Sequence, residues 1–292
     1  MRSAFSFVHP VVSFSYYVGV IMMSMVFIHP IFLATSALLL FWLNILQGNG
    51  PSMMKALRGI LFFALVITII NPLITHRGAT MLFYIFDNPV TLEAITFGYT
   101  MALSFITIAF AFASYNQIIS SHKFLYLFSR ISPKAALLTM ITMRFVPLFI
   151  RRLTHITWAQ KTKGVQLESG SLKHRAQSGM KLLTVLLVCS LEEALQTADS
   201  MHARGFSVTK RSTYIRYKME KRDWILIGVF IILIAICMIG ASNGAGILTI
   251  YPRLKPIGLY GFDWIAYASF ILYISIPVLL EGREWIWWNI QR

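Results

Sequence analysis

Long apolar runs separated by short polar segments dominate the first third and the last quarter of the chain. Six of these runs approach the length of about 20 residues that a helix needs to cross the apolar core of a bilayer, and we expect each to be a transmembrane helix. They are residues 11–28, 31–47, 56–75, 92–115, 224–240 and 264–280. Only His29-Pro30 separates the first two, which form either a tight hairpin or a re-entrant pair. The pattern predicts an all-α, polytopic membrane protein.

The segment 116–222 differs in composition, with eighteen Lys or Arg residues against five acidic residues. Its apolar stretches, residues 135–150 and 182–191, are 16 and 10 residues long, which is short for a bilayer. The first also contains Arg144 and Pro147, and a charge at mid-membrane costs about 2.5–3.5 kcal/mol. We therefore expect the segment to stay in the cytoplasm. This divides the chain into N-terminal transmembrane helices in 1–115, a coupling-helix region in 116–222 and C-terminal transmembrane helices in 223–292.

Two long amphipathic helices are predicted within this charged region. Ser132-Pro133 is typical of a helix start, and the helix runs from there toward Gly164. After a turn at 168–171, a second helix of about thirty residues, about 45 Å long, carries one apolar stripe with steps of three or four. The stripe consists of Leu172, Ala176, Met180, Leu183, Leu187, Leu191, Ala194, Ala198 and Met201.

The distribution of charge predicts the orientation in the membrane. The chain has 57% hydrophobic residues and a net charge of +15. With the N-terminus inside the cell, 23 of the 26 Lys and Arg residues lie on the cytoplasmic side, and Arg77, Arg253 and Lys255 lie outside. Cytoplasmic loops are rich in Lys and Arg, so we expect a multi-pass protein of the cell membrane with both termini in the cytoplasm. This asymmetry accounts for the basic composition without a nucleic-acid partner.

Both predicted cytoplasmic helices end in a cation followed by glycine. The tracts are Thr162-Lys163-Gly164 and Ala203-Arg204-Gly205, with the two cations 41 residues apart. Glycine after a helix readily adopts the left-handed conformation, and a cation in the last turn interacts favourably with the helix dipole. The pattern therefore fits two explanations, an ordinary helix end or a rigidly placed charge that binds a partner.

The residues around these tracts resemble a known family. Read in order, the chain contains Met143-Arg144-Phe145-Val146-Pro147, then the tract 159–165, then the tract 198–206. It resembles the transmembrane T component of energy-coupling factor (ECF) transporters, the family that includes cobalt-transport permeases of the CbiQ type. That family carries an Arg-Phe-x-Pro-like tract and two Ala-Arg-Gly motifs on cytoplasmic coupling helices. The second motif is intact here, whereas Thr162 and Lys163 replace the alanine and arginine of the first. Lysine keeps the charge but lacks the planar fork of arginine.

The resemblance implies a role and partners. In this family the T component hydrolyses no ATP. Its coupling helices dock on two ABC-type ATPase subunits or domains, and a separate S component in the membrane captures a vitamin or transition-metal ion. The resemblance therefore implies a transporter subunit without catalytic residues or cofactor, whose two motifs contact the ATPases. It leaves the transported substrate open.

Signatures of other chemistry are weak in the sequence. No GxxxxGK[ST] tract is present to bind nucleotide phosphates, the histidines never form HExxH, and the two cysteines lack metal-ligand spacing. We therefore expect no metal site. Three other classes stay open. The first is the permease of a conventional ABC transporter, which Glu192-Glu193-Ala194 followed by Gly205 faintly resembles. The second is a membrane enzyme acting on lipid, and the third is a scaffold without a transport role.

Overall fold

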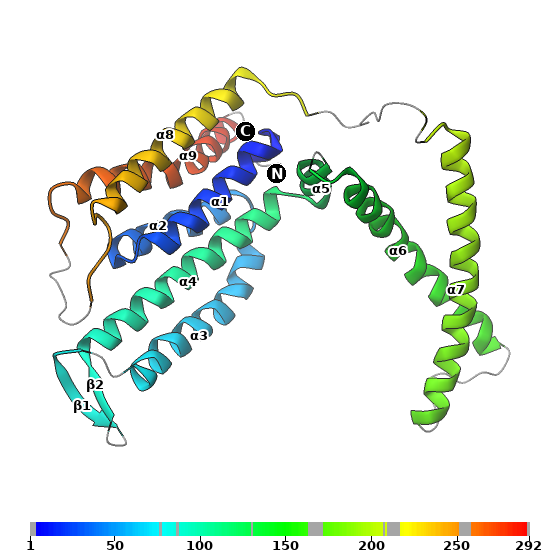
Figure 1. The fold of residues 1–292 in the computed structure, drawn as a ribbon, viewed down its shortest axis with the longest axis horizontal. Coiled ribbons are helices and arrows are strands. Elements are labelled where there is room, and N and C mark those ends of the chain that lie inside the picture. The colour runs from blue at the N-terminus through cyan, green and yellow to red at the C-terminus, as the bar shows by residue number, and fades with distance from the viewer. Residues whose placement is uncertain are drawn as a thin grey trace. The chain divides into compact units, whose positions relative to one another are not determined.

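The computed structural model describes residues 4–75, 78–85, 88–129, 131–162, 172–206, 208, 217–250 and 258–290. The chain divides into two compact units (Figure 1). Unit 1 combines Met1–Phe124 with Tyr217–Arg292, and unit 2 is Leu125–Arg216. The two ends of the sequence thus fold together, and the charged middle of the chain forms a unit of its own.

The main helices of unit 1 follow the six apolar runs: α1 (Pro10–Val26), α2 (Pro30–Leu46), α3 (Gly50–Ile74), α4 (Leu92–Ile118), α8 (Lys221–Ser242) and α9 (Asp263–Ile290). The unit also contains the 3-10 helix η1 (Ala4–Phe7) and the start of α5 (Ser121–Ser129). Helix α4 packs against α1, α2 and α3, while α9 packs against α2 and α8 (Figure 1). The predicted all-α, polytopic architecture is confirmed.

The first two helices begin with the same His-Pro signature. At each start the histidine Nδ1 accepts a hydrogen bond at 3.3 Å from the backbone N–H two residues later, that of Val11 in α1 and that of Ile31 in α2. The following proline, at the first helical position, has no N–H to leave unpaired. Both helices pack against α4 and contact α9, while α1 also packs against α8 and α2 also packs against α3. The short connection therefore joins two helices that share two neighbours and differ in the third.

Hydroxyl and amide side chains link the helices inside the apolar core of unit 1. The hydroxyl oxygens of Tyr17 in α1 and Ser114 in α4 are 2.6 Å apart, and Ser114 donates to Gln47 Oε1 at 2.8 Å. Asn44 of α2 donates to the Phe110 carbonyl of α4 at 3.0 Å. In a bilayer, bonds of this kind help to hold helices together because lipid tails are as apolar as the helix surfaces. They fix α1 and α2 to α4.

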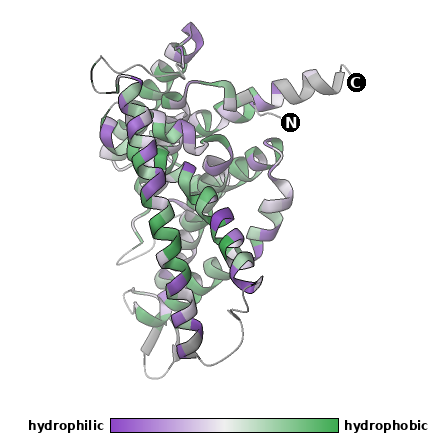
Figure 2. Ribbon diagram, turned by 90° about the vertical axis from the view of Figure 1, so that its right-hand side faces the viewer, coloured by the Kyte–Doolittle hydropathy of each residue, from purple (hydrophilic) through white to green (hydrophobic). Residues whose placement is uncertain are grey.

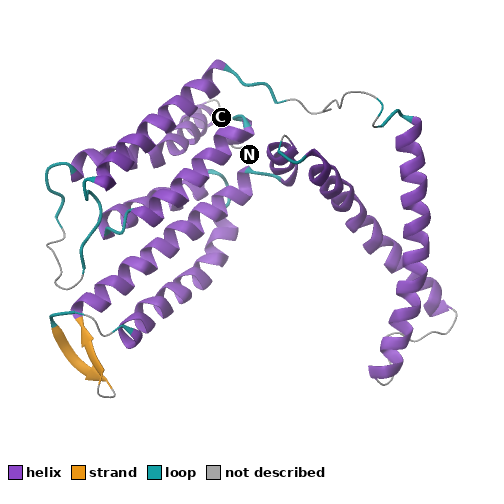
Figure 3. Cartoon of the chain, in the orientation of Figure 1, coloured by secondary structure: helices purple, strands orange, loops and turns teal. Residues whose placement is uncertain are grey.

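The structure has a β-hairpin between α3 and α4 (Figure 3). The sequence analysis did not predict it. Its strands, β1 (Met81–Ile85) and β2 (Asn88–Thr91), are antiparallel. The carboxylate of Glu93, in the first turn of α4, accepts hydrogen bonds from the backbone N–H groups of Ala79 at 3.3 Å and Thr80 at 3.2 Å. The aromatic and β-branched residues of β1 favour a strand, but a run of five residues between two long helices carries little signal.

Unit 2 contains the rest of α5, together with α6 (Pro133–Thr162) and α7 (Leu172–Ala203). The two long helices predicted for the charged region are confirmed, including the start of α6 at Pro133. Helix α7 is 32 residues long, close to the predicted length. In Figure 2, hydrophobic residues occupy the middle of α7, while hydrophilic residues are more frequent toward its two ends.

Five helices in the described part of the chain are long and apolar enough to cross a membrane, namely α3, α4, α6, α8 and residues Asp263–Arg283 of α9. Helices α1 and α2 are apolar but only 17 residues long. The sequence prediction keeps α6 in the cytoplasm because its apolar stretch is 16 residues long. The helix continues on both sides of that stretch and reaches 30 residues. Since length and composition also allow it to span, its cytoplasmic location stays a prediction.

Candidate functional site

The second predicted motif forms the end of α7. The backbone of Gly205 has a φ of 74°, in the left-handed region. Its N–H donates to the carbonyl of His202 at 2.9 Å, and the N–H of Phe206 donates to the carbonyl of Met201 at 3.0 Å. These two bonds make a Schellman motif, which closes a helix and requires a residue that tolerates positive φ. The glycine of the motif therefore has a definite structural role.

The Schellman motif gives Arg204 a fixed place on the backbone. The Arg204 N–H donates to the Ser200 carbonyl at 3.2 Å, so the residue continues the last helical turn. Both Ala203 and Arg204 are exposed, and a Cβ added at Gly205 would meet nothing within 4 Å. A charge carried on such a rigid end loses less conformational freedom on binding than a charge on a loose loop. The motif thus presents a cation and leaves room beside it.

The structure describes the first motif only at its first residue. Thr162 is the last residue of α6, it is exposed, and its hydroxyl donates to the Ala159 carbonyl at 2.8 Å. Lys163 and Gly164 lie outside the described residues. Helix α6 therefore ends next to the predicted cation.

The Arg-Phe-x-Pro-like tract lies in the interior of α6, away from the helix end. Arg144 and Pro147 are exposed, and Phe145 stacks on Phe149 with ring centroids 5.6 Å apart. At 1.5 Å per residue, Arg144 is about 27 Å from the end of the helix at Thr162. Pro147 has no N–H to donate within the helix, which weakens the helical bond pattern there. The tract is therefore a separate feature of α6 and not part of a joint site with Thr162.

An ion pair joins the two long helices. Arg152 Nη1 of α6 lies 2.8 Å from Glu193 Oε2 of α7 and also donates to the Cys189 carbonyl at 3.3 Å. The two charged side chains are 33% and 27% exposed, so the pair stabilises the contact by no more than about 1 kcal/mol. The sequence analysis missed this pair, because helical periodicity does not reveal the register in which two helices cross. The one signal in the sequence for this contact is that Arg152 and Glu193 carry opposite charges.

Most of the predicted apolar stripe on α7 is exposed. Met180, Leu183, Leu187 and Leu191 are between 47% and 68% exposed. Helix α7 meets α6 through the face that carries Cys189 and Glu193 instead. A contiguous exposed apolar surface of this kind marks a contact with another protein or with a membrane. The stripe is therefore available for a partner outside the chain.

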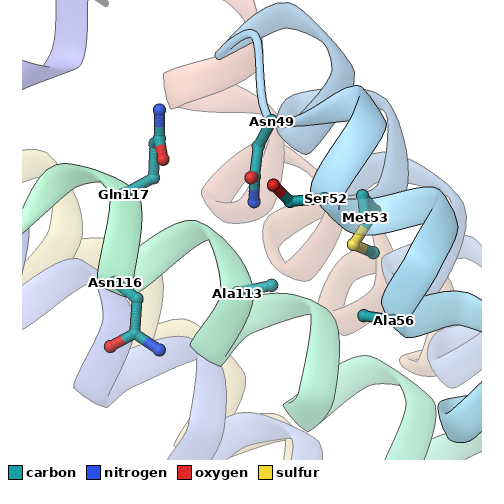
Figure 4. Close-up of a pocket in the computed structure, with 7 residues that line it drawn as sticks. All are labelled: Asn49, Ser52, Met53, Ala56, Ala113, Asn116 and Gln117. Carbon is teal, nitrogen blue, oxygen red and sulfur yellow. The ribbon is translucent and has the colours of Figure 1, made fainter.

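A hollow at the ends of α3 and α4 has a volume of about 240 Å³ (Figure 4). Its lining residues are Asn49, Ser52, Met53, Ala56, Ala113, Asn116 and Gln117. The volume is below the usual range of ligand pockets, and none of the lining side chains is ionisable. In the described part of the chain, no group of three or more His, Cys, Asp or Glu residues could hold a metal ion. The helix-end motif of α7 is the stronger candidate for function.

Known proteins with similar sequences connect these features to a family. The CbiQ family, described as cobalt transport protein, matches residues 8–215. The chain is 27% identical over 254 residues to the energy-coupling factor transporter transmembrane protein EcfT of Exiguobacterium sibiricum, across 81% of this chain and 92% of that protein. It is 26% identical over 193 residues to EcfT of Macrococcus caseolyticus, across 62% and 71% of the two chains.

A shorter match to EcfT of Leuconostoc gelidum has 35% identity over 106 residues, which is 35% of this chain and 40% of that protein. The family match covers more than half of the chain and includes both α6 and the end of α7. The apolar helices of the structure agree with a multi-pass membrane protein. The chain belongs to the CbiQ family, and so to the transmembrane T components of ECF transporters.

Proposed function

We propose that this chain is the coupling subunit of an ATP-driven uptake transporter of the ECF type. Helices α6 and α7 act as cytoplasmic coupling helices, which transmit the motion of two ABC-type ATPase subunits or domains. A separate S component receives that motion and carries a vitamin or a transition-metal ion. The chain itself has no catalytic residue and needs no cofactor, because ATP is hydrolysed in the partners. The name shared by the relatives, energy-coupling factor transporter transmembrane protein, supports a place in such a complex.

One observation carries this proposal: α7 ends in an exposed arginine held by a Schellman motif. The exposed apolar residues Leu187 and Leu191 lie further along the same helix, about 20–26 Å from that arginine. A helix with a rigid cation at its tip and apolar surface along its length is complementary to a partner that offers an acidic site and an apolar face. The apolar contact excludes water, and an ion pair in a water-poor contact is stronger than the same pair in solvent. The contact residues are Thr162, Lys163 and Gly164 on one tip and Ala203, Arg204 and Gly205 on the other.

The remaining features have supporting roles in the proposal. Lys163 keeps the charge of the first tip, although it lacks the two-pronged geometry of arginine. Arg144, Phe145 and Pro147 shape the middle of α6, where the proline interrupts the regular helical bonds. Both termini face the cytoplasm, as the excess of Lys and Arg on that side suggests.

Purification in mild detergent tests this function. We expect the full chain to copurify with ABC-type ATPase subunits and a small membrane subunit, and to hydrolyse no ATP when isolated from them. In liposomes that contain all the subunits, uptake should stop when the small membrane subunit is left out. Transport that continues without that subunit would instead identify the permease of a conventional ABC transporter. An isolated chain that hydrolyses ATP would contradict the proposal outright.

A further inference from the structure

Phe5, Val8 and His9 of the N-terminal segment 4–9 are buried in unit 1, whereas Phe7 is 62% exposed. Charged side chains from α5, α8 and α9 hold the segment. The backbone N–H of Phe5 donates to Glu281 Oε1 of α9 at 3.0 Å, and both residues are buried. A buried carboxylate is costly unless it is hydrogen-bonded. Glu281 forms such a hydrogen bond with the backbone of this six-residue segment, so the carboxylate holds the segment in place.

A second charged side chain holds the same segment from α5. Lys123 Nζ donates to the carbonyl of Ser6 at 2.6 Å and to the carbonyl of Ile118 at 3.1 Å. The ammonium thus bridges the N-terminal segment and the end of α4. Burial lowers the pKa of Lys123, which agrees with a side chain that is drawn out of solvent into this bridge.

The third contact lies at the start of α8. The backbone N–H of His9 faces Asp223 Oδ1 at 3.5 Å, and the His9 ring meets the edge of Tyr217 with centroids 6.2 Å apart. The other oxygen of Asp223 accepts from the Glu220 N–H at 3.1 Å in a capping box. The buried aspartate therefore serves two purposes, because it caps α8 and faces the N-terminal segment.

These contacts coincide with the two places where the chain passes between the units. Unit 2 begins after Phe124, one residue beyond Lys123, and the chain returns to unit 1 at Tyr217. Helix α5 runs through the first of these places without a break, from Ser121 to Ser129. A continuous helix is a rigid element that can carry motion past a boundary. One short segment is thus bonded close to both places where the chain passes between the units, at Lys123 and at Asp223. We call these two places the roots of unit 2.

We propose that residues 4–9 act as an N-terminal clamp, which holds both roots of unit 2 and limits its motion relative to the transmembrane unit. Lys123, Asp223 and Glu281 are the positioning residues of the clamp. The consequence for transport rests on the proposed function. If the roots are held, a motion of the coupling helices moves the transmembrane unit; if they are loose, the coupling helices move without it. The clamp itself depends only on contacts within unit 1.

Distance measurements on the full chain in lipid nanodiscs test the clamp. In a chain whose half-buried Cys189 is replaced by alanine, nitroxide labels are placed at Phe62→Cys on α3 and Arg175→Cys on α7, both exposed positions. Pulsed electron paramagnetic resonance gives the distance distribution between them. We expect Lys123→Met and Glu281→Met, which remove the donor and the acceptor of these bonds, to widen that distribution at least two-fold. Arg283→Gln changes an exposed charge one turn or less from Glu281 and should leave the width unchanged.

Two further measurements make the result decisive. Lys123→Arg keeps the cation and should restore a narrow distribution. A label pair within unit 1, at Phe62→Cys and Trp224→Cys, should keep its width in every variant. An unchanged width between the units in Lys123→Met and Glu281→Met overturns the clamp. Equal broadening of the pair within unit 1 also overturns it, because the residues then hold only the local fold.

The same variants separate the clamp from the proposed function. No ATPase is present in the nanodisc experiment, so it can succeed or fail whatever the partners are. In the complex, clamp variants should still copurify with the ATPase subunits, since they leave both helix tips intact. If the unmodified chain captures no ATPase, the proposed function fails, while the distance result for the clamp stands by itself.

Discussion

Replacing Arg204 with glutamate is expected to abolish copurification of the chain with its ATPase subunits. Arg204 lies at a closed, exposed helix end. Under the proposed function, a charge reversal there places a carboxylate against an acidic groove of the partner. Loss of one member of a desolvated charge pair costs about 2–5 kcal/mol, which corresponds to binding about 30- to 5,000-fold weaker. The dissociation constant of the complex between the detergent-solubilised chain and the purified ATPase subunits measures the effect.

Two matched variants show whether position or charge is responsible. Arg175→Glu makes the same change on the same helix at an exposed position near the opposite end, and it should leave the affinity within about two-fold, as expected of a surface charge. Arg204→Lys keeps the charge but loses the planar fork, so an intermediate affinity is expected. Normal copurification of the Arg204→Glu chain would show that this tip is not an anchor.

Replacing Gly19 with alanine is expected to destabilise the transmembrane unit by about 1–3 kcal/mol, the usual cost of overpacking a core. A Cβ at Gly19 of α1 would collide with the hydroxyl of Tyr273 on α9 and would lie 2.8 Å from its Cζ. That hydroxyl donates to the Tyr16 carbonyl at 3.0 Å, and the rings of Tyr16 and Tyr273 stack. The added methyl therefore disturbs both packing and a buried hydrogen bond.

The free energy of unfolding in mixed micelles measures this loss. Gly59→Ala is the matched control, because a Cβ there would meet nothing within 4 Å and alanine favours a helix. Its stability should be unchanged or higher. Combining Gly19→Ala with Tyr273→Phe removes the colliding oxygen, so the loss in the double variant should be smaller than the sum of the two single losses. Equal stability of Gly19→Ala and Gly59→Ala would contradict the close contact.

Local signals made much of the helical framework predictable. Proline at the first position of α6 and the glycine after α7 are read from a few neighbouring residues, and the structure has the corresponding helix start and Schellman motif. The apolar stripe of α7 also follows from its spacing. The spacing shows that Met180 and Leu187 share a face, but it does not show what covers that face. Both side chains are exposed in the structure, so the stripe is a candidate surface for contact with a partner and not a face that packs within the chain.

Contacts between distant parts of the sequence were not predictable. Phe5 and Glu281 are 276 positions apart, and their bond depends on how the first and last elements of unit 1 come together. Arg152 and Glu193 pair because of the register in which α6 and α7 cross. The β-hairpin was missed for a different reason, since two strands of five and four residues give too short a pattern to stand out beside long apolar helices.

The location of the α7 tip tests the central claim of this account most directly. A membrane-impermeant maleimide can label His202→Cys, an exposed position two residues from Arg204, in a chain whose half-buried Cys189 is replaced by alanine. We expect labelling in inverted membrane vesicles but not in intact cells, with at least ten-fold slower labelling when the ATPase subunits are bound. Labelling from the outside of intact cells, or a rate unaffected by the ATPases, would contradict a cytoplasmic helix end that docks on them.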